Sequence, residues 1–232
     1  MDFEDTLQAA RPTSRIDLNR YLMERSGLRD GDHILDAGCG ICGPSIHFAQ
    51  NRNVTIEAVT LSSYQVSEAR NAIRKAGLQK RINVQQGDFQ HLPSLFKKSN
   101  FDRAVFLESF SHAGVPLSVL TGAFELLKPG GTLYIKDFFA KVRADPKEHA
   151  RLQDVIAKVN EVFFLHTPSL QETVLMLEQT GFQRQWIQPI QFELDNSVWN
   201  KFNKTHGFDL YSGQPAIEWC DWIELNYRKP IN

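Results

Sequence analysis

A glycine-rich loop beside an acidic residue is the clearest chemical feature of this sequence. Gly38 and Gly40 follow Asp36, and the loop lies between an expected strand, residues 33–37, and an expected helix through residues 46–49. Glycine has no Cβ, so such a backbone can approach a ligand closely, and the carboxylate favours a cationic group nearby. The loop is either a nucleotide-cofactor site or only a tight turn. Its place between a strand and a helix favours the cofactor site.

Polar residues also follow the next two expected strands. Thr60 and Gln65 can bond ribose hydroxyls, and this strand tip carries no acid, which counts against the NAD site of a dehydrogenase. After the third strand, Gly87 precedes Asp88 and Phe89. Asp88 can accept a hydrogen bond from an adenine amine and Phe89 can cover the ring. A plain turn with a core phenylalanine is the alternative.

The cysteines and histidines show no metal-ligand spacing. Cys39 and Cys42 form a C-x-x-C pair, but no second pair accompanies it, and Cys39 belongs to the glycine motif. A structural zinc site usually has four such ligands, so we expect no metal. Three cysteines in a chain of 232 residues also make no disulfide framework, which indicates a reducing, cytoplasmic compartment.

These candidate residues need a scaffold, which the sequence predicts from alternating β-rich runs and amphipathic stretches. Strands are expected at 33–37, 54–61, 81–86, 101–108, 132–137, 185–192 and 219–228. Helices are expected at 15–22, with Ser14 as cap and Gly27 as end, through 46–49, and at 63–76, 117–127 and 172–179. A turn is expected at residues 128–131, because Pro129 and Gly130 do not continue a helix. The prediction is a Rossmann-like α/β fold, a seven-stranded, mostly parallel sheet with an antiparallel C-terminal edge strand.

Composition and charge narrow the classes of protein. Apolar residues make up 42% and charged residues 23% of the 232 residues, which predicts a single globular domain. The net charge of -1 supplies no basic field for nucleic acid. No run approaches the ~20 apolar residues of a membrane span, and the acidic start of the chain is unlike a signal peptide. We therefore expect a cytoplasmic monomer or homodimer without nucleic-acid or membrane partners.

Six ordered motifs resemble the class I methyltransferases, which depend on S-adenosylmethionine (SAM). The motifs are residues 34–45, 59–65, 87–89, 101–112, 126–131 and 135–138. Within that family, the sequence is similar to the branch of sterol, tocopherol, cyclopropane-fatty-acid and natural-product sugar O-methyltransferases. The resemblance implies one class I methyltransferase domain over residues 1–232, with an N-terminal helical cap at 1–30 and a short lid insertion at 141–167.

The resemblance also implies SAM as the cofactor and S-adenosylhomocysteine as its product. The residues that would contact the cofactor lie at the strand tips: Asp36, Gly38, Gly40, Thr60, Leu61, Gln65, Gly87, Asp88, Phe89 and Leu107. The glycines of the first loop would face the methionine portion, and the second strand would hold the ribose. Asp88 and Phe89 would contact adenine, and the backbone of Leu107 would pass near the methionine amine. Cys42 stands where this branch normally has glycine, and its Cβ would either crowd the methionine end or be absorbed locally.

Three residues near the expected methyl group are candidates for catalysis. His112 lies just beyond the fourth strand, and histidine ordinarily titrates near neutral pH, which suits removal of a hydroxyl proton. Similar sugar O-methyltransferases use a histidine here and an aspartate where Asp137 stands. Many carry two adjacent histidines, and Ser111 replaces the first of them. Glu108 either ties the loop to its neighbours or receives a cationic acceptor, and helix capping or packing is the alternative role for His112.

The predicted function is methyl transfer from SAM to a small molecule, such as a hydroxyl of a sugar or secondary metabolite in natural-product biosynthesis. C-methylation of an isoprenoid or lipid is an alternative, and it would need an acidic and aromatic pocket rather than a base. A SAM-binding protein that transfers no methyl group is a third hypothesis, supported by Cys42 and the missing second histidine. Late aromatic residues would line the acceptor site or pack the edge strands: Trp199, Phe202, Phe208, Tyr211, Trp219 and Trp222.

Overall fold

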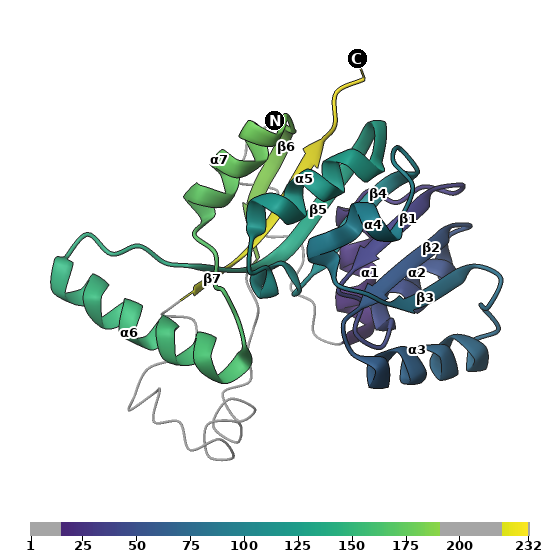
Figure 1. The fold of residues 1–232 in the computed structure, drawn as a ribbon, viewed down its shortest axis with the longest axis horizontal. Helices are drawn as coiled ribbons and strands as arrows, with labels where there is room; N and C mark the ends of the chain where they lie inside the picture. The colour runs from purple at the N-terminus through teal and green to yellow at the C-terminus, as the bar shows by residue number, and fades with distance from the viewer. Residues whose placement is uncertain (1–14, 191–219, 232) are drawn as a thin grey trace.

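The computed structural model describes residues 15–190 and 220–231, which contain a sheet of seven strands in the order β3-β2-β1-β4-β5-β7-β6 (Figure 1). The strands are β1 (His33–Ala37), β2 (Thr55–Thr60), β3 (Ile82–Gln86), β4 (Phe101–Leu107), β5 (Leu127–Ala140), β6 (Gln183–Pro189) and β7 (Cys220–Arg228). The α-helices are α1 (Arg15–Arg25), α2 (Gly43–Asn51), α3 (Ser63–Lys75), α4 (Leu92–Leu95), α5 (Pro116–Leu126), α6 (Pro146–Phe163) and α7 (Leu170–Thr180). Two 3-10 turns are η1 (Phe89–His91) and η2 (Phe110–His112). The predicted α/β fold with a mostly parallel seven-stranded sheet is confirmed.

The first five strands pair in parallel, with β1 at the centre between β2 and β4. Parallel neighbours need crossover connections, and helices supply them on both faces. Successive residues of β1 therefore enter different cores: Ile34 packs with α1, α2 and α3, and Leu35 packs with α4, α5 and α7. Burial on both faces explains why two apolar residues, Ile34 and Leu35, stand next to each other in β1.

The C-terminal strands depart from the prediction in their order. β7 runs antiparallel to β5, as expected of the last strand, but it lies between β5 and β6, so that β6 forms the edge. Residues 128–131 belong to β5 and are not the turn that Pro129 suggested. The segment after β7 holds them there, because the N–H of Lys229 donates to the carbonyl of Gly131 and the N–H of Gly130 donates to the carbonyl of Lys229, both at 2.9 Å.

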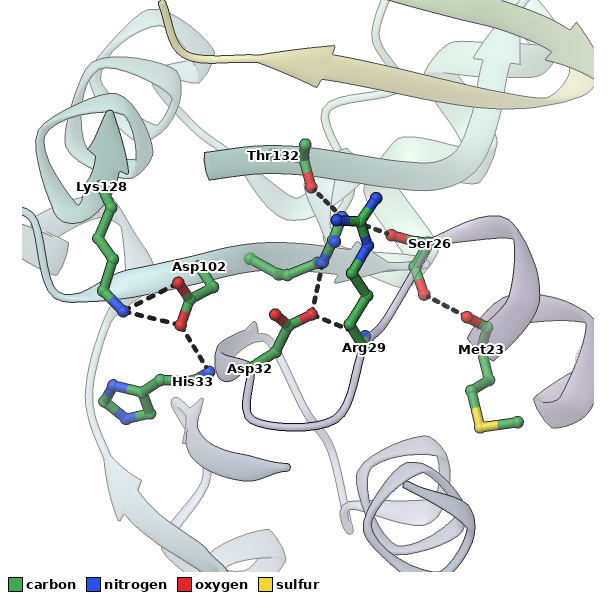
Figure 2. A network of polar contacts seen from close by, with 9 residues as sticks. Met23, Ser26, Arg29, Asp32, His33, Asp102, Lys128 and Thr132 are labelled. Carbon is green, nitrogen blue, oxygen red and sulfur yellow. Dashed lines mark hydrogen bonds and ion pairs between the residues drawn. The ribbon is translucent and has the colours of Figure 1, made fainter. Parts of the chain in front are cut away.

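Charged side chains gather at the amino ends of β1, β4 and β5, where Figure 2 shows them in contact with one another. Arg103 Nε donates to Asp32 at 2.7 Å, and its Nη1 donates to Thr132 Oγ1 at 2.7 Å. Lys128 Nζ pairs with both carboxylate oxygens of Asp102, at 2.9 and 2.8 Å. These contacts lock the starts of three neighbouring strands together.

α6 lies within residues 141–167, the segment for which an insertion is predicted, and is set apart from the other helices (Figure 1). A third apolar cluster, around Leu152, Ile156 and Leu165, joins it to Cys220 at the start of β7. Among the described residues, no helix has both the length and the apolar composition needed to cross a membrane. Ser14, much of the predicted N-terminal cap and five members of the late aromatic group lie outside the described residues: Trp199, Phe202, Phe208, Tyr211 and Trp219.

Candidate functional site

A cavity of about 490 Å³ lies at the carboxyl ends of β1, β2 and β4. Its lining residues are Asp36, Gly38, Cys39, Gly40, Pro44, Thr60, Leu61, Ser62, Gln65, Asp88, Phe89, Gln90, Leu107, Glu108, Ser109 and His112. This is the edge at which open α/β sheets bind ligands, and the volume suits a small molecule. The structure brings together all of the predicted site residues except Gly87 and Asp137, which do not line the cavity.

The glycine loop has the backbone that its residue types indicate. Gly38 has φ +87°, and a Cβ there would lie 2.4 Å from the Cβ of Ser109, so no other residue fits. Gly40 has φ +53°, and no atom lies within 4 Å of the position its Cβ would take. Backbone is therefore exposed to open cavity at Gly40, whereas Gly38 is required by protein packing.

Cys42 shows why glycine is expected at its position. It has φ 62° and ψ 27°, the left-handed conformation, at the N-terminal end of α2. Its side chain is fully buried in the core against α2 and does not line the cavity. Of the two outcomes considered for this residue, local absorption fits the geometry and crowding of the methionine end does not. Cys39 does line the cavity, and a hydrogen bond with Cys42 together with burial raises the pKa of its thiol far above the ordinary value.

Asp36 is a buried carboxyl group at the end of β1. It is 2% exposed, and Ser45 Oγ donates to its Oδ2 at 2.6 Å. Burial raises the pKa of Asp36 to about 6, although the bond from Ser45 opposes the shift. The carboxylate would thus gain from a cationic partner in the cavity, because such a partner stabilises its charged form.

The tip of β2 offers one polar pair and one exposed apolar side chain. Thr60 Oγ1 donates to Gln65 Oε1, and the Ser62 side chain accepts from the N–H of Gln65 as the cap of α3. Leu61 is 70% exposed beside them, so an apolar surface stands open at the mouth of the cavity. The spacing Ser62-x-x-Gln65 is a capping-box pattern, and this local signal could have found Ser62 from the sequence.

The tip of β3 divides into packing and lining residues. A Cβ on Gly87 would lie 2.6 Å from Leu95 Cδ1 and 2.9 Å from Val59 Cγ2, so this glycine serves close packing. Asp88 lines the cavity and accepts from the N–H of Gln90 at 2.9 Å. Phe89 also lines the cavity.

Glu108 stands at the tip of β4 in a strained conformation. Its φ is 55°, which is uncommon for a residue other than glycine, and its side chain is 48% exposed. The carboxylate accepts a hydrogen bond from Lys136 Nζ, which lies 4.1 Å from the ring centroid of Trp222. The side chain of Lys136 is 1% exposed. Lys136 belongs to β5 and Glu108 follows β4, so their separation in the sequence gave no sign of this pair. Glu108 is thus an anion held at the cavity wall by a buried cation.

His112 lies at the end of η2 with an exposed side chain that reaches the cavity. Its Nδ1 is 3.1 Å from the carbonyl oxygen of Phe164, in the residue that follows α6. Ser109 begins the same turn and donates from Oγ to the carbonyl of Ala37 at 2.6 Å. The loop after β4 is therefore fastened to β1 on one side and to the insertion on the other.

Asp137 lies behind this loop and is fully buried. Its Oδ2 accepts from the N–H of Ser111 at 3.0 Å, and its Oδ1 accepts from the N–H of Phe138 at 2.9 Å. Burial raises the pKa of Asp137 to about 6, against these two hydrogen bonds. The geometry gives Asp137 contact with the backbone next to His112 and none with the cavity.

Ser109 and Gln90 are lining residues that the sequence did not single out. Ser109 packs against Gly38, and Gln90 Oε1 accepts from the N–H of Val115 at 3.1 Å. Both roles depend on contacts between distant segments, for which the sequence offers no local signal. Within residues 15–190 and 220–231, no group of three or more His, Cys, Asp or Glu side chains is arranged to hold a metal ion.

Comparison with known proteins relates this geometry to one family. The family model described as "Methyltransferase domain" matches residues 28–193. A curated relative, the 24-methylenesterol C-methyltransferase 2 of Oryza sativa subsp. japonica, is 37% identical over 124 residues, which are 52% of this chain and 33% of that protein. The chain spans about a third of the length of the first curated relatives it matches.

Solved structures share the fold at low sequence identity. The [4+2]-cyclase SpnF superposes with a TM-score of 0.75 at 19% identity, over 97% of this chain and 86% of that one. A geranyl diphosphate methyltransferase in complex with SAM superposes with a TM-score of 0.72 at 16% identity, over 92% and 85% of the two chains. At such identities the likeness concerns the fold alone.

Proposed function

Since this chain belongs to the methyltransferase domain family, we propose that it transfers a methyl group from SAM to a small-molecule acceptor. The observation that carries the proposal is the single cavity in which the glycine loop after β1 meets His112 and Glu108 after β4. A cofactor site and two groups suited to handle an acceptor thus share one space. The expected acceptor is a hydroxyl of a secondary metabolite or sugar.

The lining chemistry fits SAM. Gly40 leaves open space beside its backbone, and the buried carboxyl of Asp36 lies in the same wall, as a cationic methionine end requires. Thr60 and Gln65 present hydroxyl and amide groups at the tip of β2, where a ribose would be held. Asp88 accepts hydrogen bonds, which suits an adenine amine. With Thr60 and Gln65 holding the ribose, the tip of β2 needs no acidic residue.

SAM, when bound, would supply a methyl group already activated by a sulfonium centre. The chain then has to orient the acceptor, exclude water and take up the acceptor's proton. His112 is our candidate for the last role, because its ring lines the cavity and one of its nitrogens is engaged by Phe164. Glu108 adds a negative charge on the same wall.

Asp137 we assign to positioning. It accepts from the N–H of Ser111, one residue before the proposed base, and it does not line the cavity. We also keep, as proposals, a role in natural-product biosynthesis, a cytoplasmic setting, a monomer or homodimer, and the absence of nucleic-acid, membrane or metal partners.

C-methylation of an isoprenoid or lipid is the second candidate. Glu108 favours it, since a carboxylate in the cavity can stabilise a carbocation, and the ring of Trp222 lies behind its Lys136 partner. The curated relative quoted above is named as a C-methyltransferase and one solved neighbour as a geranyl diphosphate methyltransferase. The third hypothesis, binding without transfer, loses one support because Cys42 lies outside the cavity.

Calorimetric titration with SAM, S-adenosylhomocysteine and NAD tests the cofactor first. Micromolar binding of the two sulfur compounds and none of NAD is the expected result. Preferential binding of NAD, or no binding of either sulfur compound, would refute the proposal. The Leu61→Asp variant should weaken SAM binding while Leu175→Asp, at another exposed apolar position away from this cavity, should not.

A screen of hydroxylated and isoprenoid acceptors, read by release of S-adenosylhomocysteine, then tests transfer. His112→Ala should abolish most transfer to a hydroxyl, and Glu108→Gln should do so for transfer to carbon. Glu57→Gln is the matched control, because Glu57 is a hydrogen-bonded carboxylate in the middle of β2, away from the cavity. No release with any acceptor, despite SAM binding, would favour the hypothesis of binding without transfer.

A further inference from the structure

The segment after α6 contacts the 3-10 turn η2 through two hydrogen bonds. The carbonyl of Phe164 lies 3.1 Å from His112 Nδ1, and the N–H of His166 donates to the carbonyl of Ser111 at 2.6 Å. One bond uses the imidazole and the other uses the backbone beside it. The insertion thus holds both the ring and the turn that carries it.

The partner of Nδ1 decides where the proton of the ring lies. A carbonyl oxygen can only accept, so the nitrogen that faces Phe164 must carry the hydrogen. In the neutral ring, Nε2 is then the unprotonated nitrogen. Nε2 is therefore the atom available to take a proton from an acceptor in the cavity that His112 lines.

The Phe164 carbonyl is itself held in place by α6. Phe164 has φ 54° and ψ 47°, a left-handed conformation. Its side chain is 85% exposed, so packing of the side chain does not hold the residue in this conformation. The carbonyl of Asn160 accepts from the N–H groups of Phe164 and Leu165, the latter at 2.9 Å. Leu165 is buried in the apolar cluster of α6, so the strained residue is anchored on its C-terminal side.

The side chain of Asn160 closes the same segment. Its Oδ1 accepts from the N–H of Thr167 at 3.1 Å and from Thr167 Oγ1 at 2.6 Å. Residues 164–167 are therefore tied to one asparagine by both its backbone and its side chain. Among these groups, the asparagine side chain is the part that a substitution can remove.

We propose that Asn160 is a positioning residue that, through the carbonyl of Phe164, keeps His112 in the Nδ1–H tautomer and leaves Nε2 free as the base. The inference rests on the proposed function for the role of Nε2. The tautomer and its dependence on Asn160 are properties of the chain that hold or fail without any acceptor. Asn160 lies 48 positions from His112 in the sequence and does not line the cavity, so no motif points to it.

The test is long-range proton–nitrogen NMR on chain labelled with ¹⁵N-histidine, with the His112 signals assigned by their loss in His112→Ala. The expected neutral ring has a protonated Nδ1 and an unprotonated Nε2. Asn160→Ala should shift the two nitrogens toward averaged values, and Asn160→Asp, which keeps an accepting oxygen, should restore the native pattern. Asn51→Ala is the matched control, since Asn51 donates to the carbonyl of His47 at the end of α2.

A native ring with the proton on Nε2 would overturn the proposal, and so would an Asn160→Ala ring with unchanged signals. Should Asn160→Ala fail to fold, Thr167→Val removes only the hydroxyl bond and should give a smaller shift in the same direction. Failure of the proposed function looks different: the tautomer would be as expected, but His112→Ala would retain methyl transfer.

Discussion

At the amino ends of β1, β4 and β5 the charged side chains contact one another, whereas at the carboxyl ends of β1 and β4 the carboxyl groups of Asp36 and Glu108 line a cavity, although Glu108 also pairs with Lys136. Asp32 precedes β1 and is paired with Arg103, while Asp36 near the end of the same strand faces the cavity. Asp102 in β4 is paired with Lys128, while Glu108 beyond it faces the cavity. The same residue types occur at both ends, so residue type does not distinguish structure from function.

The pKa values express the difference between the two ends. Burial acts to raise the pKa of Asp102, but hydrogen bonds from Lys128 and from the N–H of His33 outweigh it and hold that pKa below its ordinary value. Asp36 has no such cation, and at Asp137 the hydrogen bonds and the charge of Lys136 only partly oppose burial, so the pKa of each is raised to about 6. A carboxyl group without a protein cation is the one that a ligand or a proton can still stabilise.

Removal of one histidine at each end of the sheet should separate catalysis at the carboxyl end from stability at the amino end most sharply. His112→Ala should lower kcat by about 100-fold or more, because a general base contributes roughly 10²–10⁴-fold, while thermal stability changes little. His33 contacts the carbonyl of Asn100 at 3.2 Å and the ring of Phe101 at 4.7 Å between centroids. His33→Ala should cost about 1 kcal/mol in urea unfolding without changing kcat. Equal losses of kcat in both variants would remove the distinction between the ends.

Breaking the ion pair at the amino end should affect stability alone. Arg103 and Asp32 have side chains that are each 13% exposed, and Arg103→Met leaves the carboxylate without its cation. We expect a loss of about 3 kcal/mol in the free energy of unfolding, measured in urea, with kcat per folded molecule unchanged. Adding Asp32→Asn to this variant should recover part of the loss. A fall in kcat without loss of stability would contradict the structural role.

The pH dependence of stability should have opposite sign at the two ends. The pKa of Asp137 is about 6 in the folded chain, above its ordinary value of 3.8, so the folded state binds the proton more tightly and the contribution of this group to stability falls as pH rises between these values. The free energy of unfolding of Asp137→Asn, relative to that of the native chain, should rise by about 2 kcal/mol from pH 4 to pH 7. The amide oxygen of the variant can still accept from the N–H of Ser111, so that hydrogen bond is kept.

Asp102 is the comparison for that experiment. Its folded pKa is lowered, so its stabilisation is present above the ordinary value and is lost as pH falls through the folded pKa. Asp102→Asn should therefore lower the free energy of unfolding at pH 7, and this loss should shrink as the pH falls below 4. The loss at pH 7 should be under about 1 kcal/mol, because the Asp102–Lys128 pair is partly exposed. Urea unfolding at each pH measures both variants, and equal slopes would contradict the contrast.

Two glycines with similar backbones provide the smallest and most selective test. Gly40 and Gly31 both have positive φ, +53° and +89°, and neither has an atom within 4 Å of the position of a Cβ. Alanine at either position should cost about 1 kcal/mol of stability through the left-handed backbone. Only Gly40→Ala should also weaken SAM binding, by about tenfold or less in calorimetry, since only Gly40 lines the cavity. A matching loss of affinity in Gly31→Ala would mean that strain, not contact, explains the effect.

Local patterns predicted much of this molecule. The apolar pair in β1 and the glycines after it act within a few residues, and the corresponding elements follow the predicted boundaries closely. The capping box at Ser62 is a further local signal, which the prediction did not use. Parallel strands must end at the same edge of a sheet, so the alternation of strands and helices already grouped Asp36, Thr60, Asp88 and Glu108. The placement of Asp137 behind the loop, instead of in the cavity, was beyond such reasoning because it depends on burial.

The sequence by itself determined the family, the alternating elements and the strand tips that line the cavity, because short-range hydrogen bonding and periodic burial specify these features. The tertiary structure decided the rest: β7 pairs between β5 and β6, Lys136 pairs with Glu108, and the carbonyl of Phe164 contacts His112, 52 positions earlier in the chain. Each of these contacts joins segments whose spacing along the chain carries no information about their distance in space. Packing of the whole sheet and of α6 brings them together, and the final environment of the proposed base follows from it.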